Sequence, residues 1–155
     1  MHELNLHEAE FEYDAEDPSG YRAGAVRVSS TLEASETGVK LYEIPPGESL
    51  CPYHYEYVEE WLLVLGGEVV VRTPDGEHTA RTGTIVRFPA GPEGAHKLSN
   101  REAGAARVLM FSSSREPAVA VYPDSDKIGV WPGDDRDSLM VRRADGHVPY
   151  YDGEA

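Results

Sequence analysis

The sequence PYHYEYVEEWLLVLGG, residues 52–67, decides the fold of this chain and carries its most informative side chains. Residues of equal parity share one face of an extended strand, so His54, Glu56 and Glu60 are expected on the same face. The apolar residues Leu62 and Val64 continue that face, which places a carboxylate at the head of a row of core residues. A buried carboxylate costs several kcal/mol unless it is paired or bound to a metal. The stretch therefore predicts a core strand that begins at a functional site.

A second imidazole, His96, lies in the turn-rich stretch FPAGPEGAHKLSN, residues 88–100. If the two hairpins meet inside a β-barrel, His54, Glu60 and His96 converge on one point. Two imidazoles and one carboxylate are favoured by non-haem iron, and manganese, nickel, zinc and cobalt also accept them. Either Glu56 or a water could supply a fourth ligand. We therefore expect a divalent transition metal (Fe, Mn, Zn or Ni) as the cofactor.

The rest of the chain has the pattern of many short strands joined by turns. Thr73–Pro74–Asp75–Gly76 places Pro and Gly at turn positions, which predicts a hairpin. No apolar stripe with helical spacing persists for three turns, so helices are expected to be short. This pattern predicts an all-β sandwich or barrel. Strands are expected at residues 25–29, 39–44, 60–65, 68–72, 84–88, 95–100, 106–112, 118–122 and 128–131.

The length of 155 residues predicts one domain. Residues 1–20 form an acidic leader whose alternating apolar residues indicate an edge strand laid on the body. Residues 21–155 are expected to form the barrel domain. Its end is predicted to be a C-terminal hairpin made by residues 139–143 and 147–151, followed by a short tail.

The chain is acidic, with a formal charge of −14 and an isoelectric point near 4.7. Such a charge repels phosphate backbones and anionic lipid headgroups, so neither a nucleic acid nor a membrane surface is an expected partner. The single cysteine, Cys51, cannot form an intramolecular disulfide and fits a reducing compartment. With no signal sequence and no apolar run of membrane-spanning length, a cytoplasmic location is expected.

The stretch around His54 and the stretch around His96 resemble the two signature motifs of the cupin family. The first motif, Gly, spacer, His-x-His, spacer, Glu, six residues, Gly, is matched from Gly47 through His54, Glu56 and Glu60 to Gly67. The second motif, Gly, five residues, Pro-x-Gly, spacer, His, three residues, Asn, is matched by Gly83, Pro89, Gly91, His96 and Asn100. The motifs span residues 47–100, about a third of the chain. The resemblance implies a double-stranded β-helix (jelly-roll) barrel with a metal held by His54, Glu60 and His96.

The chain departs from the cupin pattern at Glu56, which stands where the second motif histidine would be. Replacing a neutral imidazole by an anionic carboxylate gives the metal site a harder ligand set with more oxygen donors. Three outcomes are open: the site binds metal, binds it weakly, or belongs to a metal-free structural barrel. If Glu56 is not a ligand, it is the best candidate for a catalytic general base.

A substrate pocket is expected beside the metal, lined by Tyr42, Tyr53, Arg87, Phe88 and Met110. Arg87 could hold a substrate carboxylate by a bidentate contact, or form a salt bridge at the rim.

The expected function is binding of, or action on, a small polar molecule of the sugar or organic acid type. Isomerisation, decarboxylation and dioxygenation all occur in proteins of similar sequence, and a non-catalytic sensor is the alternative. Barrels of this kind resemble proteins that dimerise through a strand edge or a sheet face, so a homodimer is also expected.

Overall fold

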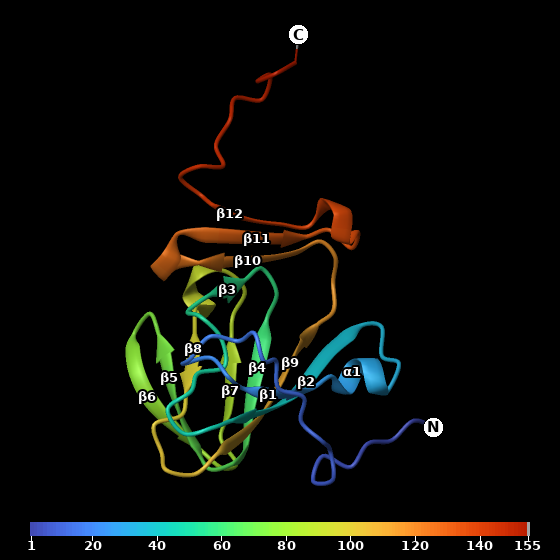
Figure 1. Cartoon of the computed structure of the whole chain (residues 1–155), viewed down its shortest axis with the longest axis vertical. Coiled ribbons are helices and arrows are strands. Elements are labelled where there is room, and N and C mark those ends of the chain that lie inside the picture. The colour runs from blue at the N-terminus through green and yellow to red at the C-terminus, as the bar shows by residue number, and fades with distance from the viewer. Residues whose placement is uncertain (155) are drawn as a thin grey trace.

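The computed structural model describes residues 1–154 and consists mainly of three antiparallel sheets (Figure 1). The largest sheet has five strands, which pair in the order β1-β2-β9-β4-β7. The bounds of these strands are Gly24–Val26 (β1), Thr37–Ile44 (β2), Ala106–Ser113 (β9), Glu60–Gly66 (β4) and Ile85–Phe88 (β7). The central strand β9 pairs with β2 along eight residues, so the middle of this sheet is its most continuous part.

A three-stranded sheet in the order β6-β5-β8 closes the barrel on the other side of the core. Its strands are Glu68–Thr73 (β5), Gly76–Arg81 (β6) and Lys97–Ser99 (β8). Alternate residues of both sheets point inward and form one buried cluster, which includes Leu62 and Val64 from β4, Val69 and Val71 from β5, and Val108 from β9. The face that the sequence assigned to the core is therefore confirmed, and the architecture is the expected all-β jelly-roll barrel.

A third sheet, in the order β12-β11-β10-β3, covers one end of the barrel (Figure 1). Its strands are Tyr55–Glu56 (β3), Ala118–Tyr122 (β10), Lys127–Trp131 (β11) and Leu139–Arg142 (β12). Under this sheet Tyr53, Tyr55, Ala95 and Val121 form a second buried cluster. The tyrosines of the first motif stretch thus point away from the barrel core, as their parity predicts, and two of them are covered by the C-terminal sheet.

Helices are short. The helix α1 covers Val28–Thr31, and three single-turn 3₁₀ helices cover Pro92–Gly94 (η1), Pro123–Ser125 (η2) and Asp135–Asp137 (η3). The strand expected at residues 25–29 ends at Val26, because the Ser29 hydroxyl bonds to the Thr37 carbonyl and the Val39 amide and draws the chain into the α1 turn. No helix within residues 1–154 has the length and apolarity needed to cross a membrane.

Two turns determine how the core strands connect. The expected hairpin at residues 73–76 is present, since Thr73 pairs with Gly76 and leaves Pro74 and Asp75 as its two loop residues. Gly67 separates β4 from β5 with φ of 72°, and a Cβ there would lie 3.2 Å from the Ala105 carbonyl oxygen. Glycine is needed at that position both for the left-handed backbone and for the close approach of another segment.

The two ends of the chain differ from the prediction. The leader makes one bridge, between Glu12 and Ala25, rather than an extended edge strand. The predicted hairpin of residues 139–143 with 147–151 is wrong. Residues 139–142 instead form β12 and pair with β11, while residues 147–151 contain only turn and irregular structure and include Pro149, which lacks an amide hydrogen for a ladder. The segment after β12 leads away from the body (Figure 1).

Candidate metal centre

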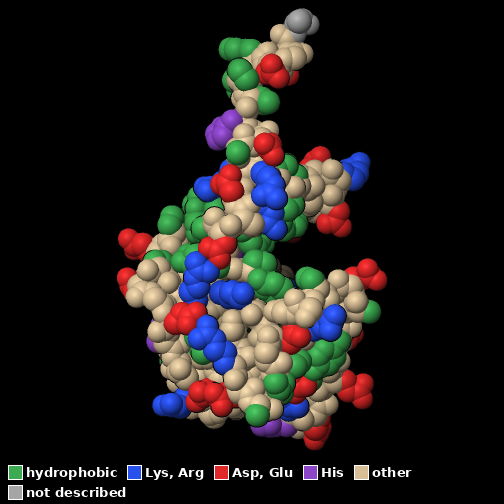
Figure 2. Space-filling model, turned by 60° about the vertical axis from the view of Figure 1, so that its left-hand side comes forward, with side chains coloured by type: hydrophobic (Ala, Val, Ile, Leu, Met, Phe, Trp, Pro, Cys, Tyr) green, Lys and Arg blue, Asp and Glu red, His purple; other side chains and the backbone are tan. Residues whose placement is uncertain are grey.

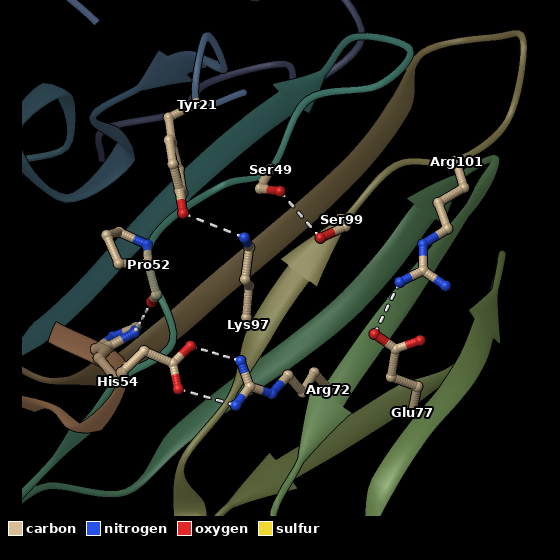
Figure 3. Close-up of polar contacts among 10 residues, drawn as sticks. Tyr21, Ser49, Pro52, His54, Arg72, Glu77, Lys97, Ser99 and Arg101 are labelled. Carbon is tan, nitrogen blue, oxygen red and sulfur yellow. Dashed lines mark hydrogen bonds and ion pairs between the residues drawn. The ribbon is translucent and has the colours of Figure 1, made fainter. Parts of the chain in front are cut away.

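The two motif histidines are direct neighbours across an antiparallel bridge. The amide of His54 donates to the His96 carbonyl at 3.1 Å, and the amide of His96 donates back at 2.8 Å. Ser49 and Ser99 form another bridge between the same segments and also bond through their hydroxyls at 2.9 Å (Figure 3). Four residues separate Ser49 from His54, whereas two separate His96 from Ser99. The two extra residues form a bulge in the segment that contains Pro52. The local bulge and the bridge together fix where the His54 ring points.

Backbone carbonyls set the orientation of both imidazoles. Nδ1 of His54 lies 3.0 Å from the Pro52 carbonyl oxygen (Figure 3), and Nδ1 of His96 lies 2.9 Å from the Gly94 carbonyl oxygen. A carbonyl only accepts, so Nδ1 carries the hydrogen in both rings and Nε2 keeps its lone pair. Nε2 of His96 is buried and has no hydrogen-bond partner among residues 1–154. Holding the remote nitrogen in this way is the usual arrangement around a metal-binding histidine.

Glu60 completes the cluster from the first position of β4. Its strand pairs Glu60 with Phe88 on one side and with Ser112 on the other, so its backbone is held in the middle of the five-stranded sheet. Oε2 of Glu60 lies 3.9 Å from Nε2 of His96. One donor atom from each of His54, Glu60 and His96 lies within 4.8 Å of the other two. The structure therefore brings together the three residues that the sequence predicts as ligands.

The protonation states follow from burial. Desolvation lowers the pKa of His54. Desolvation also lowers the pKa of His96, and with a contribution from the nearby His54 ring that pKa falls to about 4. Desolvation, with a contribution from the Glu56 carboxylate, raises the pKa of Glu60 to about 8. Glu60 and His96 are therefore not an ion pair at neutral pH. Two neutral imidazoles and a carboxyl that prefers its uncharged form are a set that a bound cation would stabilise, so the residues fit a divalent transition metal.

Glu56 lies beside this cluster on β3, where it pairs with Ala120 of β10. Burial raises the pKa of its carboxyl group, and Lys40 partly offsets that shift. Glu56 is not one of the three residues whose donor atoms converge. It lines the cavity of the centre and a second cavity of about 340 Å³ that extends toward Trp131. Its carboxylate thus faces the site, and its role as ligand or as base stays a prediction.

A cavity of about 220 Å³ gives access to the cluster. Of the predicted pocket residues, Tyr42 and Met110 line it. Cys51 also lines it, with Sγ 3.6 Å from Nδ1 of His54. Burial raises the pKa of the Cys51 thiol to about 12, so the thiol is protonated at neutral pH. The remaining lining residues are Gly38, Lys40, Leu50, His54, Glu56, Glu60, His96, Phe111 and Ser112.

Three predicted pocket residues lie elsewhere. Tyr53 belongs to the cluster under the C-terminal sheet, with the Arg72 guanidinium 3.9 Å above its ring. Arg87 faces away from the site and forms the alternative rim salt bridge, to Glu59 at 2.7 Å. Phe88 stacks on His96 with ring centroids 3.8 Å apart, so it supports the imidazole from behind. Arg87 and Phe88 are adjacent in a strand and therefore take opposite faces, which excludes both from the same pocket.

The sequence prediction missed two residues near the centre. Lys40 lines the cavity, and its charge offsets part of the rise in the pKa of Glu56 and Glu60 that burial causes. Tyr122 stacks on His54 with centroids 5.7 Å apart. The alternation of β2 would have placed Lys40 on the same face as the predicted pocket residue Tyr42. The Tyr122 contact depends on β10 crossing the end of the barrel, which no local pattern indicates.

Comparison with known families supports the fold assignment. Residues 40–112 match the family model of the cupin domain. This range contains both motif stretches and all three residues of the cluster. Together with the jelly-roll barrel, the match shows a cupin domain at residues 40–112 of this chain. A search of curated protein sequences finds no significant match.

Several solved structures share the fold. A putative sugar phosphate isomerase from Acidithiobacillus ferrooxidans superposes with a TM-score of 0.81 at 21% identity, covering 94% of this chain and 95% of that chain. A cupin-superfamily sugar phosphate isomerase from Silicibacter pomeroyi gives 0.80 at 23% identity, covering 96% and 97%. The polyketide cyclase RemF from Streptomyces resistomycificus gives 0.62 at 18% identity, covering 76% and 83%. At these identities the likeness is one of fold, and it extends over nearly the whole chain for the first two.

Proposed function

We propose that this cupin-domain protein binds a divalent transition metal through His54, Glu60 and His96 and uses the centre to bind or transform a small polar molecule. The observation that carries the proposal is the buried Nε2 of His96, which has no hydrogen-bond partner and lies 3.9 Å from the Glu60 carboxyl. A buried polar atom without a partner costs about 1–3 kcal/mol, and coordination would remove that cost. The carbonyl contacts at Nδ1 of both histidines support the same conclusion.

The chain's own residues would divide the work at such a centre. A bound metal would supply Lewis acidity and open positions for a ligand oxygen. Tyr42 and Met110 form part of the cavity wall and restrict the size of the ligand. Glu56 lines the cavity, and burial raises the pKa of its carboxyl group, which favours uptake of a proton from a ligand. We propose Glu56 as the catalytic acid–base group if the protein is an enzyme.

Metal content tests the proposal directly. Untagged protein, reconstituted in turn with Fe²⁺, Mn²⁺, Zn²⁺ and Ni²⁺ and then dialysed, is expected to retain about one metal ion per chain by elemental analysis. His96→Ala should lose it, whereas His78→Ala, an exposed histidine on β6, should retain it. Circular dichroism of each variant controls for folding. Wild-type protein that retains none of the four metals would contradict the proposal.

Turnover separates an enzyme from a non-catalytic binding protein. Keto acids, sugars, sugar phosphates and catechols make up a suitable panel, and the phosphates are included because two structural neighbours are described as sugar phosphate isomerases. An enzyme should convert a member of the panel and lose that activity in Glu56→Gln while the variant still folds. Binding without conversion would favour a sensor or storage role.

A further inference from the structure

A larger cavity adjoins the centre. It has a volume of about 790 Å³ and lies between the segment of residues 12–18 and the strands β1 and β2. Lys40, Tyr42, Leu50 and Cys51 line both this cavity and the smaller one that contains the cluster. The two spaces are therefore separated by no more than one layer of shared side chains. The larger volume is typical of sites for small organic ligands.

Two cations stand on the barrel wall of this cavity. Arg27 follows β1 and Lys40 lies on β2, and both side chains are lining residues. Within residues 1–154 neither has a carboxylate at ion-pair distance. The chain has 28 acidic and 14 basic residues, and seven arginines do form ion pairs with Asp or Glu. Arg27 and Lys40 thus belong to the seven basic residues for which the described part of the chain shows no ion pair, and both stand beside this cavity.

The register of the sheet places Lys40 near the centre. Lys40 pairs with Met110 on β9, and Met110 pairs in turn with Leu62, two residues after Glu60 on β4. Pairing residues share a face, so Lys40 and Glu60 lie on the same inner face of the sheet. Tyr42, two residues after Lys40, pairs with Ala25 of β1, and Arg27 lies two residues after Ala25. Lys40 and Glu60 thus share one face of the sheet, and Arg27, which follows the end of β1, lines the larger cavity together with Lys40.

The segment of residues 12–18 adds an acidic part to the same cavity, beginning at Glu12, which bridges to Ala25 of β1. Glu12, Asp14 and Asp17 come from the N-terminal segment, and Oδ1 of Asp14 accepts the amide hydrogen of Glu16. Carboxylates repel a second negative charge but accept hydrogen bonds from hydroxyl groups. The cavity therefore offers cations to an anionic group and carboxylates to hydroxyl groups of the same molecule.

We propose that Arg27 and Lys40 form an anion subsite that binds the carboxylate or phosphate end of a hydroxylated ligand whose other end reaches the metal centre. That the ligand reaches the metal centre rests on the proposed function, whereas binding of the anionic end depends on Arg27 and Lys40 alone. The guanidinium of Arg27 offers paired donors to a planar or tetrahedral anion, and the Lys40 ammonium adds a point charge.

Binding of three small probes tests the subsite. Glycerol 3-phosphate and glycerate carry the two candidate anionic groups on similar polyols, and glycerol is the neutral control. Titration calorimetry on metal-loaded and on metal-free protein gives each affinity. We expect at least one anion to bind about tenfold or more tightly than glycerol, because charge-assisted hydrogen bonds are roughly twice as strong as neutral ones. Whichever anion binds more tightly identifies the group, and either preference supports the subsite.

Variants assign the preference to the two cations. Arg27→Ala/Lys40→Ala should lose the preference for the anion, measured on metal-free protein so that the effect of Lys40 on the pKa of Glu60 does not enter. Arg81→Ala/Arg101→Ala is the matched control, since it removes the same charge from residues outside both cavities and should bind as wild type does. Lys40→Arg should preserve the preference. An unchanged preference in Arg27→Ala/Lys40→Ala, an equal loss in the control, or no anion preference in wild-type protein would overturn the proposal.

The two proposals fail separately. Protein that retains no metal but prefers an anion through Arg27 and Lys40 would contradict the proposed metal function and support the subsite. Protein that retains metal through His96 but binds all three probes equally would support the metal function and contradict the anion subsite.

Discussion

His54 and His96 exchange two backbone hydrogen bonds across an antiparallel bridge, and their ring centroids lie 4.8 Å apart. The two residues are 42 positions apart in the chain, so this bridge is what turns two motifs into one site. It fixes the backbone of both residues before any ligand arrives. The side chains are then oriented by carbonyl oxygens of their own segments, at Pro52 and Gly94.

This geometry predicts the tautomer of both rings. In metal-free protein at pH 7 we expect His54 and His96 to be neutral with the hydrogen on Nδ1, because each Nδ1 faces a carbonyl and burial lowers the pKa of both imidazoles. Long-range ¹⁵N–¹H correlation spectra of the imidazoles distinguish the tautomers directly. The exposed His78 serves as an internal reference. A hydrogen on Nε2, or a charged ring at pH 7, would contradict the assignment.

Metal affinity is expected to depend on pH through Glu60. The pKa of Glu60 is raised to about 8, so below that value a proton occupies the carboxyl and must leave before the metal binds. Both histidines have lowered pKa values and are already neutral over this range. Affinity should therefore rise as pH increases and level off near pH 8, with a slope of about tenfold per pH unit below it. Competition with a chelator between pH 6 and 8 measures the slope, and a flat profile would show that Glu60 is ionised without the metal.

Glu56→Gln separates the two roles considered for Glu56. The Glu56 carboxylate helps to raise the pKa of Glu60, so its neutralisation should lower that pKa and strengthen metal binding near pH 7. If Glu56 were instead a metal ligand, the same substitution would weaken binding. The sign of the change in affinity decides between them. Glu59→Gln is the control, since Glu59 is paired with Arg87 on the rim and should leave the affinity unchanged.

The sequence allowed prediction of the parts of this fold that depend on local alternation. The inward face of β4 and the turn at residues 73–76 follow from parity and turn residues, whereas the convergence of His54, Glu60 and His96 was implied by the resemblance to the cupin motifs. Alternation identifies a strand without identifying its partner, however. This is why β12 was assigned to a hairpin with residues 147–151, although it pairs with β11.

Pocket residues were predicted less well for a related reason. An aromatic residue near a motif can face the cavity, support a ligand from behind or pack under another sheet, and its position in the sequence does not distinguish these cases. Tyr42 lines the cavity, Phe88 stacks on His96, and Tyr53 lies under the C-terminal sheet. The last of these depends on β10 covering the barrel end, a long-range contact that has no local signal.

Asn100, the last residue of the second motif, is expected to stabilise the fold without taking part in the centre. Its buried side chain donates to the carbonyls of Ile44 and Gly104, and its Oδ1 accepts the amide hydrogen of Glu102. Asn100→Ala should lower the free energy of unfolding by about 3 kcal/mol, because buried backbone groups lose their partners. Thermal and urea unfolding measure the loss.

Asn5 provides the matched control for that substitution. It is the only other asparagine in the chain, is exposed, and makes one local bond to the amide of His7. Asn5→Ala should change stability by less than about 0.5 kcal/mol. Folded Asn100→Ala protein should still retain metal at the wild-type stoichiometry. Loss of metal from a variant that remains folded would show that Asn100 also acts on the site.

Self-association is predicted to use the edge of the C-terminal sheet. Strand β12 is the outer strand of that sheet and exposes Leu139, Met140 and Val141. Hydrophobic side chains also gather on the upper part of the molecule, where this sheet and the segment after it lie (Figure 2). An exposed apolar edge strand is a template for pairing with a second chain. We therefore expect light scattering to give twice the 17.1 kDa of one chain.

Charged substitutions locate the contact that holds such a dimer together. Leu139→Lys/Val141→Lys should give a monomer, because ammonium groups on both strands would face each other across the pair and could not be buried. Ile85→Lys is the comparison, since Ile85 is also exposed and lies on β7, an outer strand of the five-stranded sheet. If Ile85→Lys alone dissociates the protein, the five-stranded sheet provides the interface instead. A mass of one chain for wild-type protein at micromolar concentration would show that neither edge is used.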